Sequence, residues 1–307
     1  MYKNESADAT DDVQENPPQT SAGKRDMTEI ERRVAVAKQL AANIREYLGK
    51  LTPEQWELDS ACAEWQVRDV VSHLIGGAER QADSMERGRG GESGPPAGFV
   101  PPEAAALSAS NAQRDIDRRN QLAGNMLEAF DASYTKLHQE FDSFGEGKDG
   151  VSWDTLAWHV RRGAMTAASY VELRIQELAI HDWDIRSAFQ PDAGLDPASV
   201  PVLLDMSPAW LGMCFRPSAK LPNPVEYSLN VGPDESRQYR MSVTGDAFEM
   251  APGAATQADL SLSATAEQYL LFSYGRLTAV EGISSGKLTV TGDVAKIDQF
   301  EVWFKGL

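Results

Sequence analysis

The sequence predicts an α-helical bundle followed by a smaller α+β domain. Within residues 27–190, four long segments repeat apolar residues every three or four positions, which is the period of an amphipathic helix. Beyond residue 198, the segments VEYSLNV, RQYRMSV and ADLSLSA alternate apolar and polar residues instead, as half-buried strands do. We therefore expect an antiparallel four-helix bundle over residues 27–190 and a separate α+β domain over residues 196–307.

Breaks in composition bound the expected helices. The first helix covers residues 27–51, and the second covers residues 66–87 and ends at the segment GRGGESGPPAGFVPP. The third begins after Pro102 and runs, with room for an interruption, to about Phe144, and the fourth covers residues 164–189 after VSWDTLAWHVRRG. In the second domain we expect helices at residues 198–215 and 267–274, a strand in KLTVTG and a terminal helix ending in FEVWF.

Composition limits the location and partners of the protein. Residues 1–26 are polar and contain proline, so we expect a disordered leader, with Met27 as an alternative start. A net charge of −17 argues against nucleic acid and anionic membranes as partners. No run approaches the roughly 18 apolar residues of a membrane span, and the N-terminus is not a secretory signal. Two cysteines, Cys62 and Cys214, make no disulfide framework, which indicates a reduced cytoplasmic location.

The segment RIQELAIHDWDI, residues 174–185, carries four charged or titratable side chains at helical spacing. On a helix, Arg174, Glu177, His181 and Asp184 fall on one stripe together with Tyr170. Apolar residues flank this stripe on both sides, which a solvated face does not usually show. The pattern predicts a polar stripe that lines a cleft.

Two residues of this stripe have the spacing of metal ligands. Glu177 and His181, at i and i+4, can place an oxygen and a nitrogen on one ion. The candidate third ligand is His73, which lies off the core stripe of the second helix. Two histidines and one carboxylate, with a position left open, are typical of catalytic sites. Such ligands suit zinc first and other divalent metals next.

The neighbours of these residues allow more than one role. Arg174 can form a helix-surface pair with Glu177. Asp184 is either a solvated charge or an acceptor that orients a ligand imidazole. His159 is either structural or close to the cleft, and His138 is expected at the surface.

Two motifs resemble a known family. CAEWQVRDVVSHLIGG resembles the C-x-x-W-x-V-R-D-V-V-x-H-L segment of the mycothiol-dependent maleylpyruvate isomerase family, within the DinB-like four-helix superfamily, and RIQELAIHDWDI resembles its R-x-x-E-x-x-x-H-x-W-D segment. ADLSLSATAEQYLLFSYGR and KLTVTGD look like that family's sterol-carrier-like C-terminal domain. The resemblance implies zinc ligation by His73, Glu177 and His181. It also implies that Arg276 faces an anionic substrate, the alternative being an exposed arginine at a helix end.

The resemblance also implies a thiol-dependent reaction. A metal-held thiolate adds to the double bond of a cis-enedioic acid such as maleylpyruvate, the bond rotates, and elimination gives the trans isomer. If the adduct leaves intact, the enzyme is an S-transferase. Arg276, with Arg80 or Arg174, could hold the carboxylates, and Asp184 could act beside the metal. Cys62 and Cys214 are expected to pack rather than to react.

The low-molecular-weight thiol is not fixed by the sequence. Mycothiol, bacillithiol, glutathione and ergothioneine are all candidates. An aromatic pocket would suit the betaine of ergothioneine through cation–π contact, with Trp158 as a candidate wall. The tryptophans near the site in sequence are Trp56, Trp65, Trp153, Trp158 and Trp183, and they can equally belong to the core.

Two other classes of function compete with the thiol enzyme. A metal-dependent hydrolase would need Asp184 or His159 as general base. A carrier protein would hold an apolar ligand in its C-terminal domain and would not need His73 or His181. The sequence predicts no oligomeric state.

Overall fold

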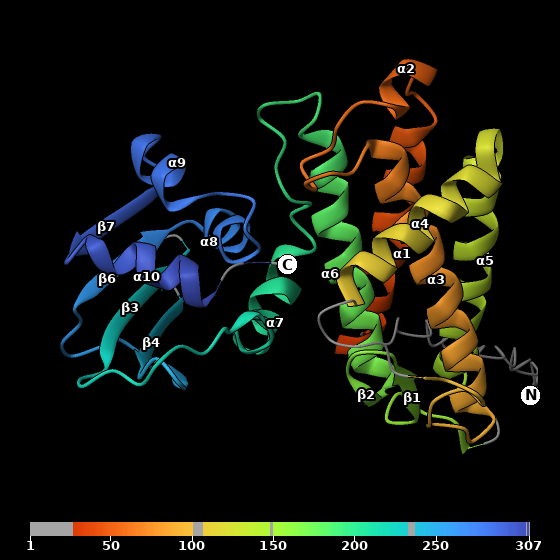
Figure 1. Cartoon of the computed structure of the whole chain (residues 1–307). Coiled ribbons are helices and arrows are strands. Elements are labelled where there is room, and N and C mark those ends of the chain that lie inside the picture. The colour runs from red at the N-terminus through yellow and green to blue at the C-terminus, as the bar shows by residue number, and fades with distance from the viewer. Residues whose placement is uncertain (1–26, 101–106, 148–149, 233–236, 305, 307) are drawn as a thin grey trace, which may run out of the picture.

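The predicted fold class is confirmed: a helical N-terminal region precedes an α+β region. The computed structural model describes residues 27–100, 107–147, 150–232, 237–304 and 306. Figure 1 shows the helices of the first region beside the sheet of the second, with α7 (Val200–Cys214) between them. The expected leader, residues 1–26, lies outside the described residues.

Four long helices form the bundle. They are α1 (Glu29–Leu48), α3 (Val67–Arg89), α5 (Met126–Gly145) and α6 (Ala167–Arg186). A short α2 (Pro53–Trp56) follows α1. The expected third helix is divided into α4 (Leu107–Leu122) and α5 by the 3₁₀ turn η1 (Ala123–Asn125). Ala123 has a φ of 46° in this turn, a left-handed conformation that cannot continue an α-helix.

Local sequence sets the helix starts, and apolar stripes set the packing. Thr28 begins α1 with a capping box to Glu31, and Thr166 caps α6 by accepting from the Ser169 amide. The expected core stripes of the second and fourth helices are buried except at Phe189, which lies beyond the end of α6 and is half-buried. The buried members are Val67, Val70, Val71, Leu74 and Ala78 of α3 and Val171, Ile175, Leu178 and Ile185 of α6. These stripes turn the polar side of α6 toward α3.

A β-hairpin precedes α6 where the sequence was expected only to lead into a helix. Its strands are β1 (Leu156–His159) and β2 (Gly163–Thr166), which pair antiparallel. Gly163 adopts a φ of 71° directly after the three-residue loop. Three-residue hairpin loops commonly place glycine at this left-handed position, so the signal was present in WHVRRG.

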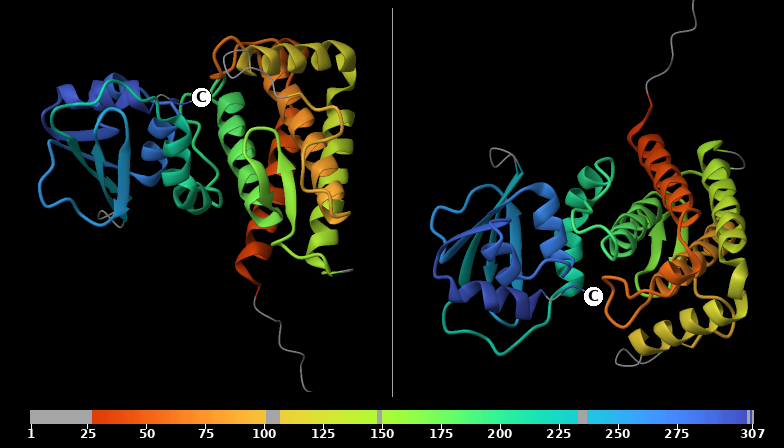
Figure 2. Two further views of the ribbon diagram at one scale, coloured as in Figure 1. Left: turned by 60° about the horizontal axis from the view of Figure 1, so that its bottom comes forward. Right: turned by 90° about the horizontal axis from the view of Figure 1, so that it is seen from above.

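The C-terminal region is built on a five-stranded sheet of order β5-β4-β3-β6-β7. Its strands are β3 (Val225–Val231), β4 (Arg237–Val243), β5 (Phe248–Pro252), β6 (Leu260–Ala264) and β7 (Leu288–Gly292). Strands β3 and β6 are parallel, and the other neighbours are antiparallel. The helices are α7, α8 (Ala266–Ser273), α9 (Ala279–Ser284) and α10 (Ala295–Trp303), and they lie around the sheet in Figure 2. Strand β5 and helix α9 were not expected.

The sheet and its helices share one apolar core. Val225, Tyr227, Leu229 and Val231 alternate into it from β3, and Phe300 of α10 packs edge-on against Tyr227. The strand expected at VEYSLNV therefore has the predicted alternation. No described helix has both the length and the apolar character needed to cross a membrane.

Candidate functional site

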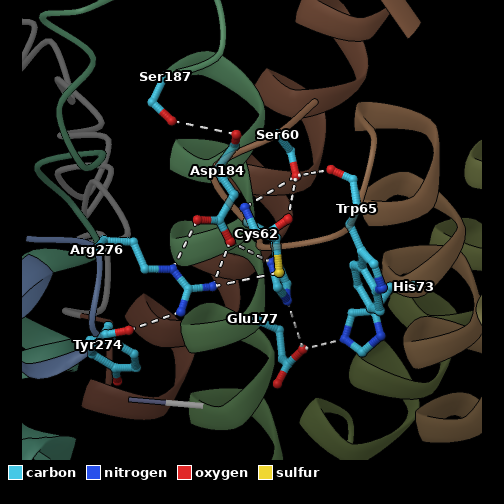
Figure 3. Close-up of polar contacts among 10 residues, drawn as sticks. Ser60, Cys62, Trp65, His73, Glu177, Asp184, Ser187, Tyr274 and Arg276 are labelled. Atoms are coloured by element: carbon cyan, nitrogen blue, oxygen red, sulfur yellow. Dashed lines mark hydrogen bonds and ion pairs between the residues drawn. The ribbon is translucent and has the colours of Figure 1, made fainter. Parts of the chain in front are cut away.

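The predicted ligand residues meet between α3 and α6. His73 projects from α3 and Glu177 projects from α6 (Figure 3). His181 follows Glu177 by one turn on α6. One ligand atom from each residue lies within 4.8 Å of the others. The Glu177 Oε2 atom is 3.0 Å from His73 Nε2 and 3.7 Å from His181 Nε2. The three side chains are 13–30% exposed, so the cluster is reachable from solvent. Two nitrogens and an oxygen therefore face a common point.

A buried carboxylate orients each imidazole from behind. Asp115 Oδ2 lies 2.8 Å from His73 Nδ1, and Asp184 Oδ2 lies 2.9 Å from His181 Nδ1. Neither carboxylate is exposed. A carboxylate that accepts from Nδ1–H fixes the tautomer that leaves the Nε2 lone pair free for a metal ion. Both rings are thus held with Nε2 toward Glu177.

The electrostatics of the cluster keep the carboxylate charged. Burial opposes ionisation of Glu177, but its hydrogen bond to His73 and the charges of His73, His181 and Arg174 outweigh burial. The pKa of the Glu177 carboxyl is therefore held below its usual range. Burial likewise opposes charge on His73, whereas Asp115 and Glu177 raise the pKa of its imidazole above the ordinary value. The cluster attracts a cation, and a metal ion would compete with a proton there.

Cys62 lies next to this cluster without being activated. Its sulfur, with His181 and Asp184, forms a second group of ligand-type atoms within 4.8 Å. Burial, followed by the charge of Asp184, raises the pKa of the Cys62 thiol to about 11. A thiol with that pKa stays protonated at neutral pH and is a weak nucleophile.

Arg276 of the C-terminal region reaches the same place. Its Nε and Nη2 donate to the two oxygens of Asp184 at 2.9 and 2.8 Å, and its Nη1 donates to the Tyr274 carbonyl (Figure 3). Burial opposes ionisation of Asp184, but its contacts with the Arg276 guanidinium and the His181 ring outweigh burial. The pKa of the Asp184 carboxyl is therefore held below the ordinary value. Arg276 therefore lies near the cluster but is already paired with a carboxylate.

Arg174 and Arg80 lie along the helices beside the cluster. Arg174, one turn before Glu177 on α6, is 4% exposed and donates from Nε to Gln81 Oε1 at 2.8 Å. Arg80 is half-buried on α3. Burial and the nearby Arg114, Arg118 and Arg174 lower the pKa of its guanidinium to about 10. Arg174 and Glu177 were expected to pair on the helix surface. The described contacts include no hydrogen bond between them, although the charge of Arg174 acts on Glu177.

Trp158 and His159 occupy the hairpin rather than the ligand cluster. The Trp158 carbonyl accepts from Ser84 Oγ, and its ring packs edge-on against Phe99. His159 Nδ1 accepts two backbone amides, and burial lowers the pKa of its imidazole to about 4. His159 is thus held in a structural role within the hairpin turn.

The other tryptophans are dispersed. Trp65 packs against His73 with ring centroids 5.2 Å apart, whereas Trp153 packs against Phe144 and Trp183 donates to the Ala193 carbonyl. The described ring contacts thus bring one indole against the ligand residues. A betaine cage usually needs several aromatic walls.

Asp115 is the functional neighbour that the sequence did not indicate. It sits in RDIDRR on α4 beside Asp117, and the two have the same local sequence character. Only the packing of α4 on α3 separates the buried Asp115 from the exposed Asp117. Burial of an unpaired carboxylate is costly, and the contact with His73 gives the buried Asp115 a partner. Only the tertiary structure reveals this contact.

The comparisons with known proteins agree with this architecture. Residues 37–186 match the family model described as the mycothiol maleylpyruvate isomerase N-terminal domain, and residues 221–305 match the SCP-2 sterol transfer family. The two matches lie one after the other along the chain. This confirms the resemblance that the two motifs and the C-terminal segments indicated. No curated protein matches the chain in sequence.

Two solved structures share the fold over most of this chain. A crystal structure of the mycothiol-dependent maleylpyruvate isomerase is 16% identical, with a TM-score of 0.57, and covers 87% of this chain and 95% of its own. A histidine-to-alanine mutant of that enzyme gives a TM-score of 0.59 at the same identity and coverage. At this identity the likeness establishes a common fold for the isomerase-like N-terminal domain and the SCP-2 domain together.

Proposed function

We propose that the protein is a metal-dependent enzyme that uses a low-molecular-weight thiol to isomerise a maleylpyruvate-like cis-enedioic acid. The observation that carries this proposal is the convergence of His73 Nε2, His181 Nε2 and Glu177 Oε2, with both imidazoles held by buried carboxylates. The match of residues 37–186 to the isomerase domain family supports the thiol. Zinc is the expected ion because the ligands are nitrogen and oxygen and one position stays open.

The residues of the site have distinct roles in this proposal. His73, Glu177 and His181 would hold the metal, which when bound supplies a cation that stabilises a thiolate at neutral pH. Asp115 and Asp184 keep the two imidazoles in the ligating tautomer. Cys62 stays protonated, so it leaves the addition to the double bond to the cofactor thiol.

The cationic residues would handle the carboxylates of the substrate. Arg276 is positioned to do so only by exchanging its contact with Asp184 for one with substrate. Arg80 and Arg174 are the further candidates for binding anionic groups of thiol or substrate. The described contacts of Trp158 are with Phe99 and Ser84 rather than with the ligand residues. Trp158 would therefore contact only the outer part of a large thiol. Both cysteines are free, in keeping with the proposed cytoplasmic location.

Two related reactions remain candidates at this site. An S-transferase would release the thiol adduct intact and needs no additional residue. A hydrolase needs a general base, but Asp184 is held by Arg276 and His181, and His159 Nδ1 accepts backbone amides. The pairing of both candidate bases favours the thiol reaction over hydrolysis.

The experiment is a calorimetric titration of zinc-loaded protein with mycothiol, ergothioneine, bacillithiol and glutathione. We expect saturable binding of one thiol and loss of at least about tenfold in affinity in His181→Ala, because this variant would lack one of the residues proposed to hold the metal that stabilises the thiolate. His138→Ala, a histidine of α5 outside the cluster, is the matched control and should bind like the parent. If no thiol binds to protein of demonstrated zinc content, the thiol proposal is wrong and the hydrolase becomes the better hypothesis.

A further inference from the structure

Helix α3 contains two adjacent glycines, Gly76 and Gly77, in its middle turns. Glycine is unfavourable in a helix interior, so a pair of them calls for a packing reason. A Cβ atom at Gly76 would lie 2.0 Å from Arg118 Nη1 and 2.9 Å from Arg80 Nη1. At Gly77 it would lie 3.0 and 3.1 Å from Nη1 and Nη2 of Arg174. The two glycines therefore make room for three guanidinium groups against the surface of α3.

The register of α3 and α6 places these groups beside the ligand cluster. His73 faces Glu177, Gly77 faces Arg174, and the Gln81 amide donates to the Tyr170 carbonyl at 2.9 Å. The residue numbers rise on α3 as they fall on α6, so the helices are antiparallel. Gly77 follows His73 by four residues, about 6 Å along the helix axis. Arg174 precedes Glu177 by three residues, about 4.5 Å along the axis.

Two of these guanidinium groups have donors with no acceptor. Arg80 Nη1 and Arg174 Nη1 are buried and have no well-aligned acceptor within the described part of the chain, although the Arg174 guanidinium also interacts with the Tyr134 hydroxyl. Arg118, by contrast, pairs with Glu79 at 3.0 Å and with Asp115 at 3.3 Å. Buried charged donors are rarely left unpaired, because their desolvation is then uncompensated. The unpaired atoms point to a ligand that supplies the acceptors.

We propose that Arg80 and Arg174 form a carboxylate-binding subsite over Gly76 and Gly77, one helical turn from His73 and Glu177. This inference rests on the proposed function, because the reacting end of the ligand is taken to lie at the ligand cluster. A planar carboxylate accepts two parallel N–H bonds from guanidinium groups, which suits the two free Nη1 positions.

Two molecules of the proposed reaction could bring this carboxylate: the thiol or the electrophile. Two pairs of probes distinguish them on zinc-loaded protein by calorimetry. The first pair is 3-mercaptopropionate and its uncharged amide, and the second is maleate and its uncharged diamide. We expect at least one charged member to bind tenfold or more tightly than its amide partner. The pair that shows the preference identifies the source of the carboxylate.

The variant Arg80→Gln tests the residues. It should reduce the preference for the charged probe to threefold or less while binding of the amide probe stays unchanged. Arg174→Gln provides a second, independent variant with the same expectation. Arg68→Gln is the matched control, because it removes the same charge from α3 at a side chain already paired with Glu57 at 2.7 Å. It should keep the full preference.

The outcomes separate this inference from the proposed function. Equal binding of charged and uncharged probes by the parent protein, or an unchanged preference in a folded Arg80→Gln, overturns the subsite. A preference lost equally in Arg68→Gln also overturns it, since a general charge effect would then explain the result. Binding of 3-mercaptopropionamide tests the thiol site by itself. Its failure would count against the proposed function, whereas the comparison of maleate with its diamide would still decide the subsite.

Discussion

The two imidazoles of the ligand cluster are oriented by carboxylates with different second partners. Asp115 contacts His73 and also Arg118 of its own helix α4. Asp184 contacts His181 and also Arg276, which comes from the C-terminal domain. The orientation of His73 therefore depends on the packing of α4 within the bundle. The orientation of His181 depends on the junction between the domains.

A third histidine gives the protein a pH-dependent stability. His138 of α5 packs against Tyr134 and Phe141, and burial followed by the charge of Lys38 lowers the pKa of its imidazole to about 4. In the unfolded chain the pKa is about 6.5. Between these values the unfolded state binds more protons, so stability rises with pH and is lost as pH falls from about 6.5 toward 4.

The substitution His138→Gln should remove this dependence. Urea unfolding at pH 7 and pH 5 should show that the parent loses about 1–2 kcal/mol more than the variant over this interval. His159→Gln is a useful comparison, since burial also lowers the pKa of His159 to about 4. An identical pH-dependent loss in parent and His138→Gln would show that His138 titrates normally in the folded protein.

Single residues were predictable where their helix carried the pattern. The spacing of Glu177 and His181 on one helix fixed their proximity, and His73 was separable from the core stripe of α3. Asp115 was not predictable, because its burial arises from where α4 crosses α3, and loop connections set that crossing. Arg276 was expected to face a substrate. Its pairing with Asp184 was not expected, because Asp184 lies 92 residues earlier in the chain.

At the scale of elements, α3 combines helix stability with space for charged side chains. Its apolar stripe is fully buried, while Gly76 and Gly77 lower the helical propensity of its middle turns. A Cβ at Gly77 would lie only 3.0 and 3.1 Å from the Arg174 nitrogens, so a larger residue at that position would displace the Arg174 guanidinium. The helix thus gives up some intrinsic stability to bring guanidinium groups next to the ligand residues.

The substitution Gly77→Ala should separate these two effects. Alanine raises helical propensity by up to about 1 kcal/mol, and the long side chain of Arg174 can move away from the new Cβ. We expect the free energy of unfolding in urea to stay equal or rise, while the calorimetric affinity for the preferred charged probe falls about tenfold as Arg174 moves.

A glycine of another helix provides the control. Gly145→Ala, in the last turn of α5, adds a Cβ whose nearest neighbour is the Trp153 ring at 3.9 Å. It should leave probe binding unchanged. If Gly77→Ala also binds the probe like the parent, the glycine is not needed to position Arg174.

Elements with a strong period were predicted, and short elements set by turns were not. The strands VEYSLNV and RQYRMSV have the predicted bounds because each alternates around a buried face. The β1–β2 hairpin was missed because its four-residue strands are too short to establish a period, and only Gly163 indicates the turn. Helix α9, six residues long, begins at a capping box rather than with an apolar repeat.

For the whole molecule, the ion pair between Asp184 and Arg276 joins the two domains at the candidate site. Both side chains are at most 9% exposed, and Arg276 Nη2 also approaches Cys62 Sγ at 3.9 Å. The pair therefore connects the bundle, the loop before α3 and the C-terminal domain at one point. Removal of one partner from a buried pair of this kind strongly destabilises the folded protein, because the other charge stays desolvated.

The substitution Arg276→Met tests this connection while keeping the length of the side chain. It leaves the buried Asp184 carboxylate with His181 as its remaining described side-chain partner, and we expect the free energy of unfolding to fall by about 3–5 kcal/mol. The same variant should bind zinc about 10–100-fold more weakly in a chelator competition, because an uncompensated Asp184 holds His181 less well in place. Arg237→Met removes the exposed pair with Asp205 and should cost about 0–1 kcal/mol without changing zinc affinity. Equal behaviour of the two variants would mean that the domains are held together by apolar packing around α7 instead, and that His181 is oriented independently of the C-terminal domain.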